Sequence, residues 1–297
     1  MLRTVVNSPL GRACGLMRTL RWLVLPMALA GCAVVAPPPI AQEARLRGDT
    51  IALLGEIHDN ADAHRMRLAM LGRALAAGWR PAIAMEQFDL PRQADIDRAR
   101  REAPRDAQHV IDLVAPSRSG WDWALYRPVI ALALDHDLPL LAANLSSADT
   151  GKIVRGGYTD VFDADRLAAL GLDRLVAPDW QAAQEREIDA GHCGLLPAAM
   201  WPAMARAQFA RDAVMADLLR THADRGIVLI AGNGHVRRDI GVPRRLGVAD
   251  LRRVLAIGFL EADESPVSAD AYDAVVRVPP APRRDPCAAL KARQLPG

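Results

Sequence analysis

Two short motifs hold the residues of this sequence that are best suited to chemistry. Each has the pattern Gly-x-x-His, the first ending at His58 and the second at His235. Glu56 lies within the first motif, and Glu86 falls between the two along the chain. Imidazoles and carboxylates that converge suit a divalent metal ion or acid–base catalysis. The sequence therefore indicates a metal site or an acid–base site formed by these four residues.

The elements that must position these residues are short apolar runs typical of buried parallel strands. Helical patterns lie between the runs, and this alternation predicts an α/β fold with a mostly parallel sheet flanked by helices. Ligands bind at the carboxyl ends of the strands in such a sheet, so we expect the motif residues at one rim, together with Asn144. The expected strands are residues 50–54, 82–85, 138–142 and 227–231, with edge strands at 254–259 and 274–278.

Two stretches lack strand signals and are expected to be helical. They are residues 91–136 and residues 160–222, and the second ends in a long amphipathic helix from about 198 to 220. We expect them to form a smaller helical subdomain that covers the carboxyl rim of the sheet. The main domain is then residues 49–280, followed by a C-terminal tail over 281–297.

The first segment predicts export rather than a folded element. Arg18 and Arg21 precede an apolar run without charge over residues 22–36, whose 15 residues are fewer than the ~20 that a spanning helix needs. The run contains Leu-Ala-Gly-Cys ending at Cys32, which resembles the lipobox of bacterial lipoproteins. We expect a signal peptide over 1–31, acylation of Cys32, a tether over 32–48 and an outer-membrane anchor facing the periplasm. The alternative is an ordinary signal peptide with a chance cysteine.

Charge and cysteine content narrow the class of protein. Removal of residues 1–31, which hold four arginines and no acid, changes the formal charge from +2 to −2, so nucleic acid is not an expected partner. Cys193 and Cys287 are then an even pair in an oxidising compartment, and we expect a disulfide that ties the tail to the helical region. The alternative is a free functional thiol at Cys193, next to His192.

Three strand-end motifs resemble those of a known family. They are Gly-Glu-x-His-Asp at 55–59, Met-Glu-x-Phe at 85–88 and Ala-Gly-x-Gly-His at 231–235. They resemble the ChaN family, in the superfamily that contains Tiki metalloproteases, TraB-like proteins and erythromycin-esterase-like enzymes. The similarity runs from about residue 49 to 278. It implies an α/β domain with a smaller helical one and a role in haem or iron acquisition.

The resemblance also implies a haem site. In the family, haem binds at a dimer interface with a tyrosine on the iron and basic side chains on the propionates, which implies a homodimer here. We rank Tyr158 first as the iron ligand because it lies in a glycine-flanked loop near basic residues. Tyr126 lies in an apolar helical pattern typical of a core residue, and Tyr272 lies in the last expected strand. The candidate haem-binding residues are Tyr158, Tyr126, Lys152, Arg155 and His192.

Two other functions are alternatives to haem binding. In a hydrolase of the superfamily, His58 would be a general base or a metal ligand, and Glu56 and Glu86 would be ligands or the base. His235 would be a ligand, and Arg211 would stabilise negative charge or pair with one of the glutamates. A lipoprotein with neither activity would retain the rim as polar scaffolding. The haem interpretation is favoured, and it adds an outer-membrane haem or iron receptor as an expected partner.

Overall fold

Six parallel strands form the central sheet of the computed structural model, which describes residues 38–117, 120–264, 268–285 and 287–288. The strand order is β3-β2-β4-β1-β5-β6, and every neighbouring pair runs parallel. The α/β fold predicted from the sequence is confirmed, and the two later strands lie side by side at one edge, as expected. The strands are β1 (Ile51–Leu54), β2 (Ala82–Asp89), β3 (Leu140–Asn144), β4 (Ile227–Ile230), β5 (Val254–Glu261) and β6 (Ala274–Val278).

The expected signal peptide over 1–31 and the acylation site at Cys32 lie outside the described residues, as does the tether up to residue 37. The last part of the expected tether packs on the fold through the 3-10 turn η1 (Ala41–Arg45), where Glu43 accepts hydrogen bonds from Arg73 at 2.7 and 2.8 Å. In the described part of the chain, no helix has both the length and the apolar character that a membrane span requires.

Both faces of the sheet are buried, which explains why its strands read as continuous apolar runs. In β1, Ala52 and Leu54 belong to one hydrophobic core, and Ile51 and Leu53 belong to a second core on the other face. Side chains alternate between faces along a strand, so both cores draw on every central strand. The sheet is therefore held rigidly from both sides, and its strand ends are fixed relative to one another.

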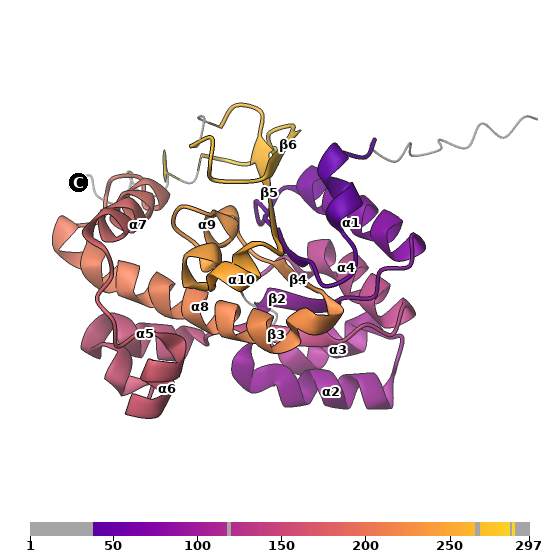
Figure 1. Cartoon of the computed structure of the whole chain (residues 1–297), viewed down its shortest axis with the longest axis horizontal. Helices are drawn as coiled ribbons and strands as arrows, with labels where there is room; N and C mark the ends of the chain where they lie inside the picture. The colour runs from indigo at the N-terminus through magenta and orange to yellow at the C-terminus, as the bar shows by residue number, and fades with distance from the viewer. Residues whose placement is uncertain (1–37, 118–119, 265–267, 286, 289–297) are drawn as a thin grey trace, which may run out of the picture. The chain divides into compact units, whose positions relative to one another are not determined.

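Four helices cover the first face of the sheet (Figure 1). The first of them begins at Asn60, whose side-chain oxygen accepts a hydrogen bond from the backbone nitrogen of Ala63 at 3.0 Å. Asparagine is one of the residues favoured at this capping position. The four helices are α1 (Ala61–Ala76), α2 (Gln93–Glu102), α3 (Ala107–Val114) and α4 (Trp123–Asp135).

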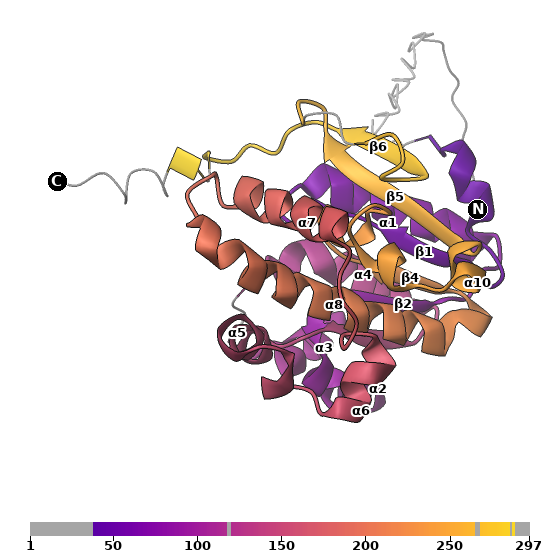
Figure 2. The same ribbon diagram turned by 60° about the vertical axis from the view of Figure 1, so that its left-hand side comes forward.

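The long helix α8 (Trp201–His222) crosses the second face (Figure 2). Its C-terminal half packs on the sheet through Met215, Ala216 and Leu219. Its N-terminal half packs against three further helices: α5 (Ser147–Gly156), α6 (Ala164–Leu170) and α7 (Pro178–Gly191). The two helical stretches that we expected in one subdomain thus pack in different places, residues 91–136 on the first face and residues 160–222 on and around α8.

Short helical turns make up the remaining connections. They are η2 (Leu90–Arg92), η3 (Tyr158–Asp160), η4 (Ala198–Met200), η5 (Ala223–Arg225), α9 (Asn233–Val236), η6 (Val242–Arg245) and α10 (Val248–Leu251). The turn η4 precedes α8, so the long helix expected from about residue 198 begins as a 3-10 turn. It ends two residues later than the expected position of about 220.

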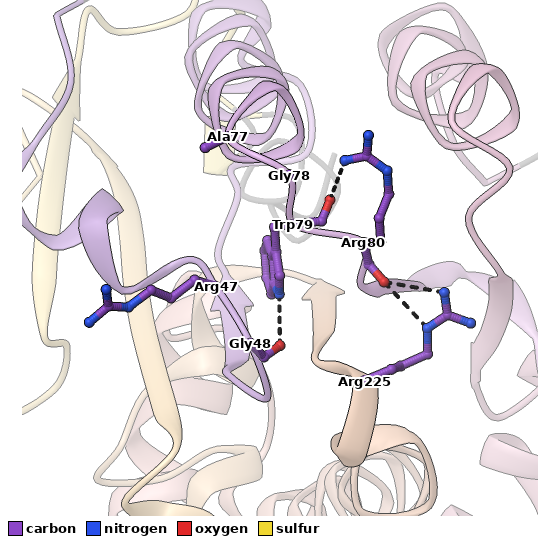
Figure 3. A pocket seen from close by; sticks show the side chains of 7 residues that line it. All are labelled: Arg47, Gly48, Ala77, Gly78, Trp79, Arg80 and Arg225. Carbon is purple, nitrogen blue, oxygen red and sulfur yellow. Dashed lines mark hydrogen bonds between the residues drawn. The ribbon is translucent and has the colours of Figure 1, made fainter.

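Trp79 links the amino-terminal ends of three strands (Figure 3). Its indole nitrogen donates a hydrogen bond to the carbonyl oxygen of Gly48 at 2.9 Å. Gly226, just before β4, has a φ of +79°, and a Cβ there would collide with that same carbonyl oxygen. Glycine is therefore required at 226 both for its backbone conformation and for the close approach of the chains.

Candidate functional site

The carboxyl ends of β1, β2 and β4 bring Glu56, His58, Glu86 and His235 to one rim, as expected from the motifs. The order β2-β4-β1 makes these strands neighbours, so the residues after them are close in space. The side chains form two hydrogen-bonded groups, one centred on Glu56 and the other on His235. Gly232, at the end of β4, lies between the two groups.

Glu56 is a buried carboxylate with four side-chain partners. Its oxygens accept hydrogen bonds from Tyr126 at 2.6 Å, from Gln87 at 3.0 Å and from Arg67, with which it forms an ion pair. His58 Nδ1 lies 2.8 Å from Glu56 Oε1. Burial alone would raise the pKa of Glu56, but the charge of Arg67 and the hydrogen bond to His58 outweigh burial and hold this pKa at about 2.

Arg67 and His64, both on α1, support this group from behind. Burial and the charge of Arg67 lower the pKa of His64 to about 4, so its ring is neutral at neutral pH. The neutral ring accepts a hydrogen bond from Arg67 at Nδ1, 3.0 Å away, and donates from Nε2 to the carbonyl oxygen of His58 at 3.1 Å. The buried chain Glu56–Arg67–His64 therefore fixes the backbone of His58 while its side chain stays half-exposed.

The second group places an imidazole between two carboxylates. His235 Nδ1 lies 2.6 Å from Asp212 on α8, and Nε2 lies 3.5 Å from Glu86. Burial lowers the pKa of His235, but the charges of Glu86 and Asp212 outweigh it and raise this pKa to about 10. Burial would raise the pKa of Glu86, yet His235 holds it at about 2. His235 is therefore an imidazolium at neutral pH.

Gly232 allows the two groups to approach. Its backbone nitrogen donates a hydrogen bond to Glu86 Oε2 at 2.8 Å. A Cβ at this position would lie 3.1 Å from Cε1 and 3.2 Å from Nε2 of His58. The Nε2 edge of His58 thus faces the end of β4, and the absence of a side chain at 232 leaves room for it there.

The expected metal centre is not seen. Among the described residues, no three His, Cys, Asp or Glu side chains are arranged to hold a metal ion. The four residues expected as ligands are engaged with Arg67, Tyr126 and Asp212 and with one another. Arg211 does not pair with either glutamate, since it donates to the side-chain oxygen of Asn144 at 3.0 Å.

Sequence reasoning missed the buried partners of the rim. Arg67 shares the buried stripe of α1 with Ala63, Met70 and Leu71. A charged residue at a core position of a helix is rarely buried without a partner, and this is the signal that identifies it. Nothing in the local sequence indicates that Asp212, rather than Arg211, reaches His235.

The three tyrosines of the described chain differ in what their hydroxyl groups contact. Tyr126 is fully buried and donates to Glu56, which agrees with its expected core position. Tyr272 donates to the carbonyl oxygen of Asn233 at 3.2 Å. The hydroxyl of Tyr158 makes no hydrogen bond within the residues that the structure describes. Burial raises the pKa of Tyr158, while the charges of Arg245 and Arg206 act in the opposite direction.

The basic residues expected beside haem lie on different helices. Lys152 and Arg155 are exposed on α5, and Lys152 forms an ion pair with Asp149 at 2.9 Å. His192 follows α7, and its Nδ1 lies 2.7 Å from the carbonyl oxygen of Ile188. Lys152 and His192 are therefore already engaged with the protein, whereas Arg155 has no side-chain partner among the residues that the structure describes.

A small pocket of about 220 Å³ lies beside α7 and η6. Arg174, Arg244 and Arg245 line it together with Trp180, and the guanidinium of Arg245 lies 4.5 Å from the centre of the Trp180 ring. Leu175, also in the lining, is fully exposed. The Nε and Nη2 atoms of Arg245 are buried with no hydrogen-bond partner in the described chain. The pocket therefore combines cations with apolar surface.

Comparison with known proteins decides the family. The family model described as haem-binding uptake, Tiki superfamily, ChaN matches residues 43–246. The chain belongs to the ChaN family. The resemblance inferred from the strand-end motifs is confirmed. No curated protein matches the sequence.

Solved structures resemble this ChaN family member in fold. ChaN of Campylobacter jejuni, whose structure was described for its cofacial haem binding, is 19% identical, with a TM-score of 0.61. The match covers 77% of this chain and 87% of that one. An erythromycin esterase mutant, EreC in its open conformation, is 13% identical over 77% of this chain and 76% of its own, with a TM-score of 0.44. The fold of the Campylobacter protein agrees with the sheet described above.

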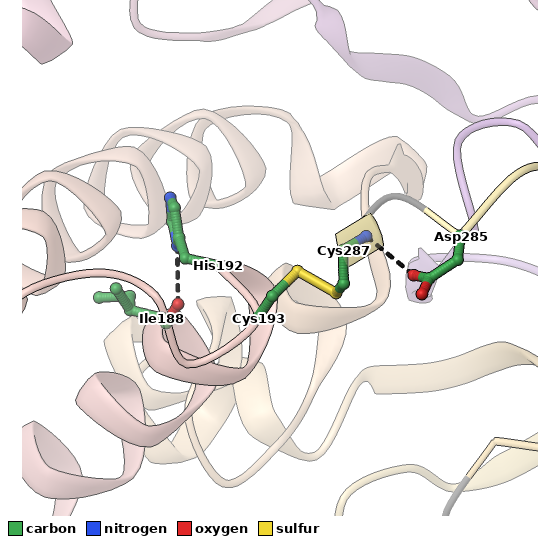
Figure 4. Close-up of a disulfide and its surroundings, with 5 residues drawn as sticks. All are labelled: Ile188, His192, Cys193, Asp285 and Cys287. Carbon is green, nitrogen blue, oxygen red and sulfur yellow. Dashed lines mark hydrogen bonds between the residues drawn. A yellow bond between two sulfur atoms is a disulfide. The ribbon is translucent and has the colours of Figure 1, made fainter. Parts of the chain in front are cut away.

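The disulfide expected from the cysteine count is confirmed. Cys193, just after α7, is bonded to Cys287 in the C-terminal tail (Figure 4). The bond excludes the alternative of a free thiol at Cys193. His192, drawn beside it, directs its ring toward the end of α7 rather than toward the disulfide.

Proposed function

We propose that this chain binds haem with Tyr158 as the ligand to Fe(III). Membership of a haem-binding family supports the ligand, and the contacts of the tyrosines support the residue. Tyr158 has a hydroxyl without a hydrogen-bond partner among the described residues, whereas Tyr126 and Tyr272 are engaged. A tyrosinate is a hard anionic ligand suited to Fe(III). Burial raises the pKa of Tyr158, and the charges of Arg245 and Arg206 act against this effect in favour of the phenolate that would bind Fe(III).

The pocket lined by Arg174, Arg244 and Arg245 fits the propionates and the porphyrin of a haem group. Its cations suit the two propionates, and the unsatisfied nitrogens of Arg245 are donors that a carboxylate satisfies. Trp180 and Leu175 suit the porphyrin. Arg245 connects this pocket to Tyr158, since its charge acts on the phenol. On this basis we assign the propionates to Arg174, Arg244 and Arg245 in preference to Lys152, Arg155 and His192.

The size of the pocket supports a dimer. Its volume of about 220 Å³ lies below the roughly 300–1,000 Å³ of sites that enclose a drug-sized ligand. Much of a bound haem would therefore project beyond this chain, next to the exposed Leu175. A second copy of the chain, related by a two-fold axis, would cover this surface. Two-fold dimers are the commonest symmetric oligomers.

A haemin titration of residues 33–297 followed by absorbance tests the ligand. These residues contain every element described above. We expect saturable binding with a tyrosinate spectrum, lost in Tyr158→Phe and retained in Tyr126→Phe, and a dimer at saturation. Full retention of the spectrum in Tyr158→Phe overturns the assignment, and unchanged affinity in Arg244→Gln overturns the propionate site.

The same proposal includes a lipid anchor at Cys32 in the outer membrane, facing the periplasm. It rests on the Leu-Ala-Gly-Cys sequence at the end of an uncharged run. Metabolic labelling with a palmitate analogue should mark the wild-type chain and leave Cys32→Ala unmarked. Recovery of Cys32→Ala in the outer-membrane fraction at the wild-type level contradicts the anchor. Partnership with an outer-membrane haem or iron receptor is tested by crosslinking in the same cells.

A hydrolase is the second candidate, and the pairing of His58 with Glu56 favours it. Glu56 orients the half-exposed His58 ring, and the hydrogen bond between them raises the pKa of His58 against the effect of burial. A histidine held in this way suits general acid–base work. A screen of ester and peptide substrates should then give a turnover that His58→Ala abolishes. Equal turnover in the variant excludes a catalytic rim.

A further inference from the structure

Arginines precede the strands at the rim opposite the candidate site. Arg47, Arg80, Arg225 and Arg253 come within four residues of the starts of β1, β2, β4 and β5. Because the strands are parallel, their amino-terminal ends meet at one edge of the sheet. The first three of these arginines line a single pocket of about 590 Å³.

The floor of this pocket is held in place by the backbone. Figure 3 shows Trp79 between Arg47 on one side and Arg80 and Arg225 on the other. The hydrogen bond from Trp79 to Gly48 fixes the indole at the centre. The backbone therefore fixes the centre of the hollow, and the three arginines form its sides.

The three arginines keep their charge available. Arg80 donates from Nη1 to the carbonyl oxygens of Leu75 and Trp79, each at 2.7 Å. Arg225 donates to the carbonyl oxygen of Arg80 at 3.2 and 3.3 Å. These bonds orient the guanidinium groups and leave their charge unneutralised. The side chain of Arg47 makes no hydrogen bond or ion pair with the described part of the chain.

Acidic residues near this rim do not line the pocket. Asp49 follows Gly48 but forms an ion pair with Arg253 at 3.0 Å, and Asp250 lies 4.0 Å from the same arginine. Asp224 precedes Arg225 and is exposed. Among the described residues, the lining holds three cations and no carboxylate. A phosphate anion is the ligand that such a pocket favours, because guanidinium groups bind its oxygens through charged hydrogen bonds.

The pocket is also close to the expected anchor along the chain. Ala41, the first residue of η1, is nine positions after Cys32. Nine extended residues span at most roughly 30 Å. The turn η1 leads directly to Arg47 and Gly48 in the pocket. An acylated Cys32 would therefore hold this rim close to the bilayer and give it first access to lipid headgroups.

We propose that the pocket formed by Arg47, Arg80 and Arg225 binds the phosphate of an anionic phospholipid headgroup. The inference rests on the lipid anchor proposed above. Headgroup binding in this pocket would orient the protein with the amino-terminal rim against the bilayer and the Glu56 and His235 groups at the far end of the strands. The anchor keeps the protein at the membrane, and the pocket sets the orientation of the protein and its preference for anionic lipids.

Cosedimentation with vesicles tests the pocket without the anchor. Residues 33–297 carry no acylation site, so binding measures the headgroup contribution alone. In about 50 mM salt, we expect binding to vesicles of phosphatidylglycerol and phosphatidylcholine and none to phosphatidylcholine alone. Each arginine should contribute about fivefold to the partition coefficient. The variant Arg47→Gln breaks no internal bond, so a fivefold loss there with an unchanged melting temperature supports the pocket.

A matched control separates the pocket from general charge. Replacing Arg101, Arg105 and Arg127 by glutamine removes the same charge from exposed positions on α2, in the turn after α2 and on α4. The triple variant at Arg47, Arg80 and Arg225 should lose binding at least tenfold more than this control. Equal losses in the two triple variants overturn the proposal, as does failure of the wild type to bind anionic vesicles.

Inorganic phosphate distinguishes a lipid site from a site for free phosphate. At constant ionic strength, millimolar phosphate should leave vesicle binding unchanged if the headgroup in its bilayer is the ligand. Saturable binding of phosphate by calorimetry, with loss of vesicle binding, overturns the lipid assignment. Failure of palmitate labelling with retained vesicle binding would refute the anchor and leave the pocket intact, so the two proposals fail separately.

Discussion

Replacing Glu56 with glutamine should destabilise the protein by about 3–5 kcal/mol. The substitution keeps the shape of the side chain and removes its charge. Arg67, whose side chain is 2% exposed, then has no anion within the core. A buried ion pair broken from one side leaves an uncompensated charge, and this desolvated guanidinium is the main source of the cost.

The pKa of Glu56 gives a second estimate of the same magnitude. Folding lowers this pKa from 4.5 to about 2, and each pKa unit corresponds to about 1.4 kcal/mol, so the carboxylate contributes about 3 kcal/mol. A lowered pKa stabilises the folded state above the unfolded value and loses this contribution as the pH falls. The difference between wild type and Glu56→Gln should therefore be complete above about pH 4.5 and shrink between pH 4.5 and 2.

Urea denaturation of residues 33–297 with the disulfide intact, followed by tryptophan fluorescence and circular dichroism, measures both effects. The control is Asp62→Asn, which makes the same chemical change in an exposed ion pair with Arg65 and should cost at most about 1 kcal/mol. A loss below 1 kcal/mol in Glu56→Gln would refute the reasoning. So would a difference from wild type that stays constant from pH 7 to pH 3.

Three further outcomes follow from the contacts. Tyr126→Phe removes a hydrogen bond to the Glu56 carboxylate and should cost about 1.5–3 kcal/mol in urea denaturation; a neutral effect would show that the bond is not formed. Cys193→Ser opens a loop with a sequence separation of 94 and should cost about 4 kcal/mol, matched by wild type under reducing conditions. Gly226→Ala should cost at least about 1 kcal/mol because of its positive φ, while Gly72→Ala, where a Cβ meets no other atom, should be neutral or stabilising.

The placement of the rim residues illustrates how far sequence patterns reach. Two Gly-x-x-His motifs and the apolar runs before them were enough to expect Glu56, His58 and His235 at one edge of a parallel sheet. The same patterns left a metal site and an acid–base site open, and among the described residues no three His, Cys, Asp or Glu side chains are arranged to hold a metal ion. What the patterns did not indicate is that Arg67, on α1, forms a buried ion pair with Glu56.

The sequence by itself determined the α/β class, the strand positions, the family and the pairing of Cys193 with Cys287. These features depend on local periodicity, on short motifs and on the count of cysteines, and all three can be read from the order of residues along the chain. Tertiary structure alone decided that Asp212 faces His235 and that the Tyr158 hydroxyl has no hydrogen-bond partner in the part of the chain that the structure describes. Such contacts join residues far apart in the chain, and they depend on how each helix is rotated and packed. The sequence pattern alone does not distinguish Asp212 from its neighbour Arg211 as the residue that faces His235.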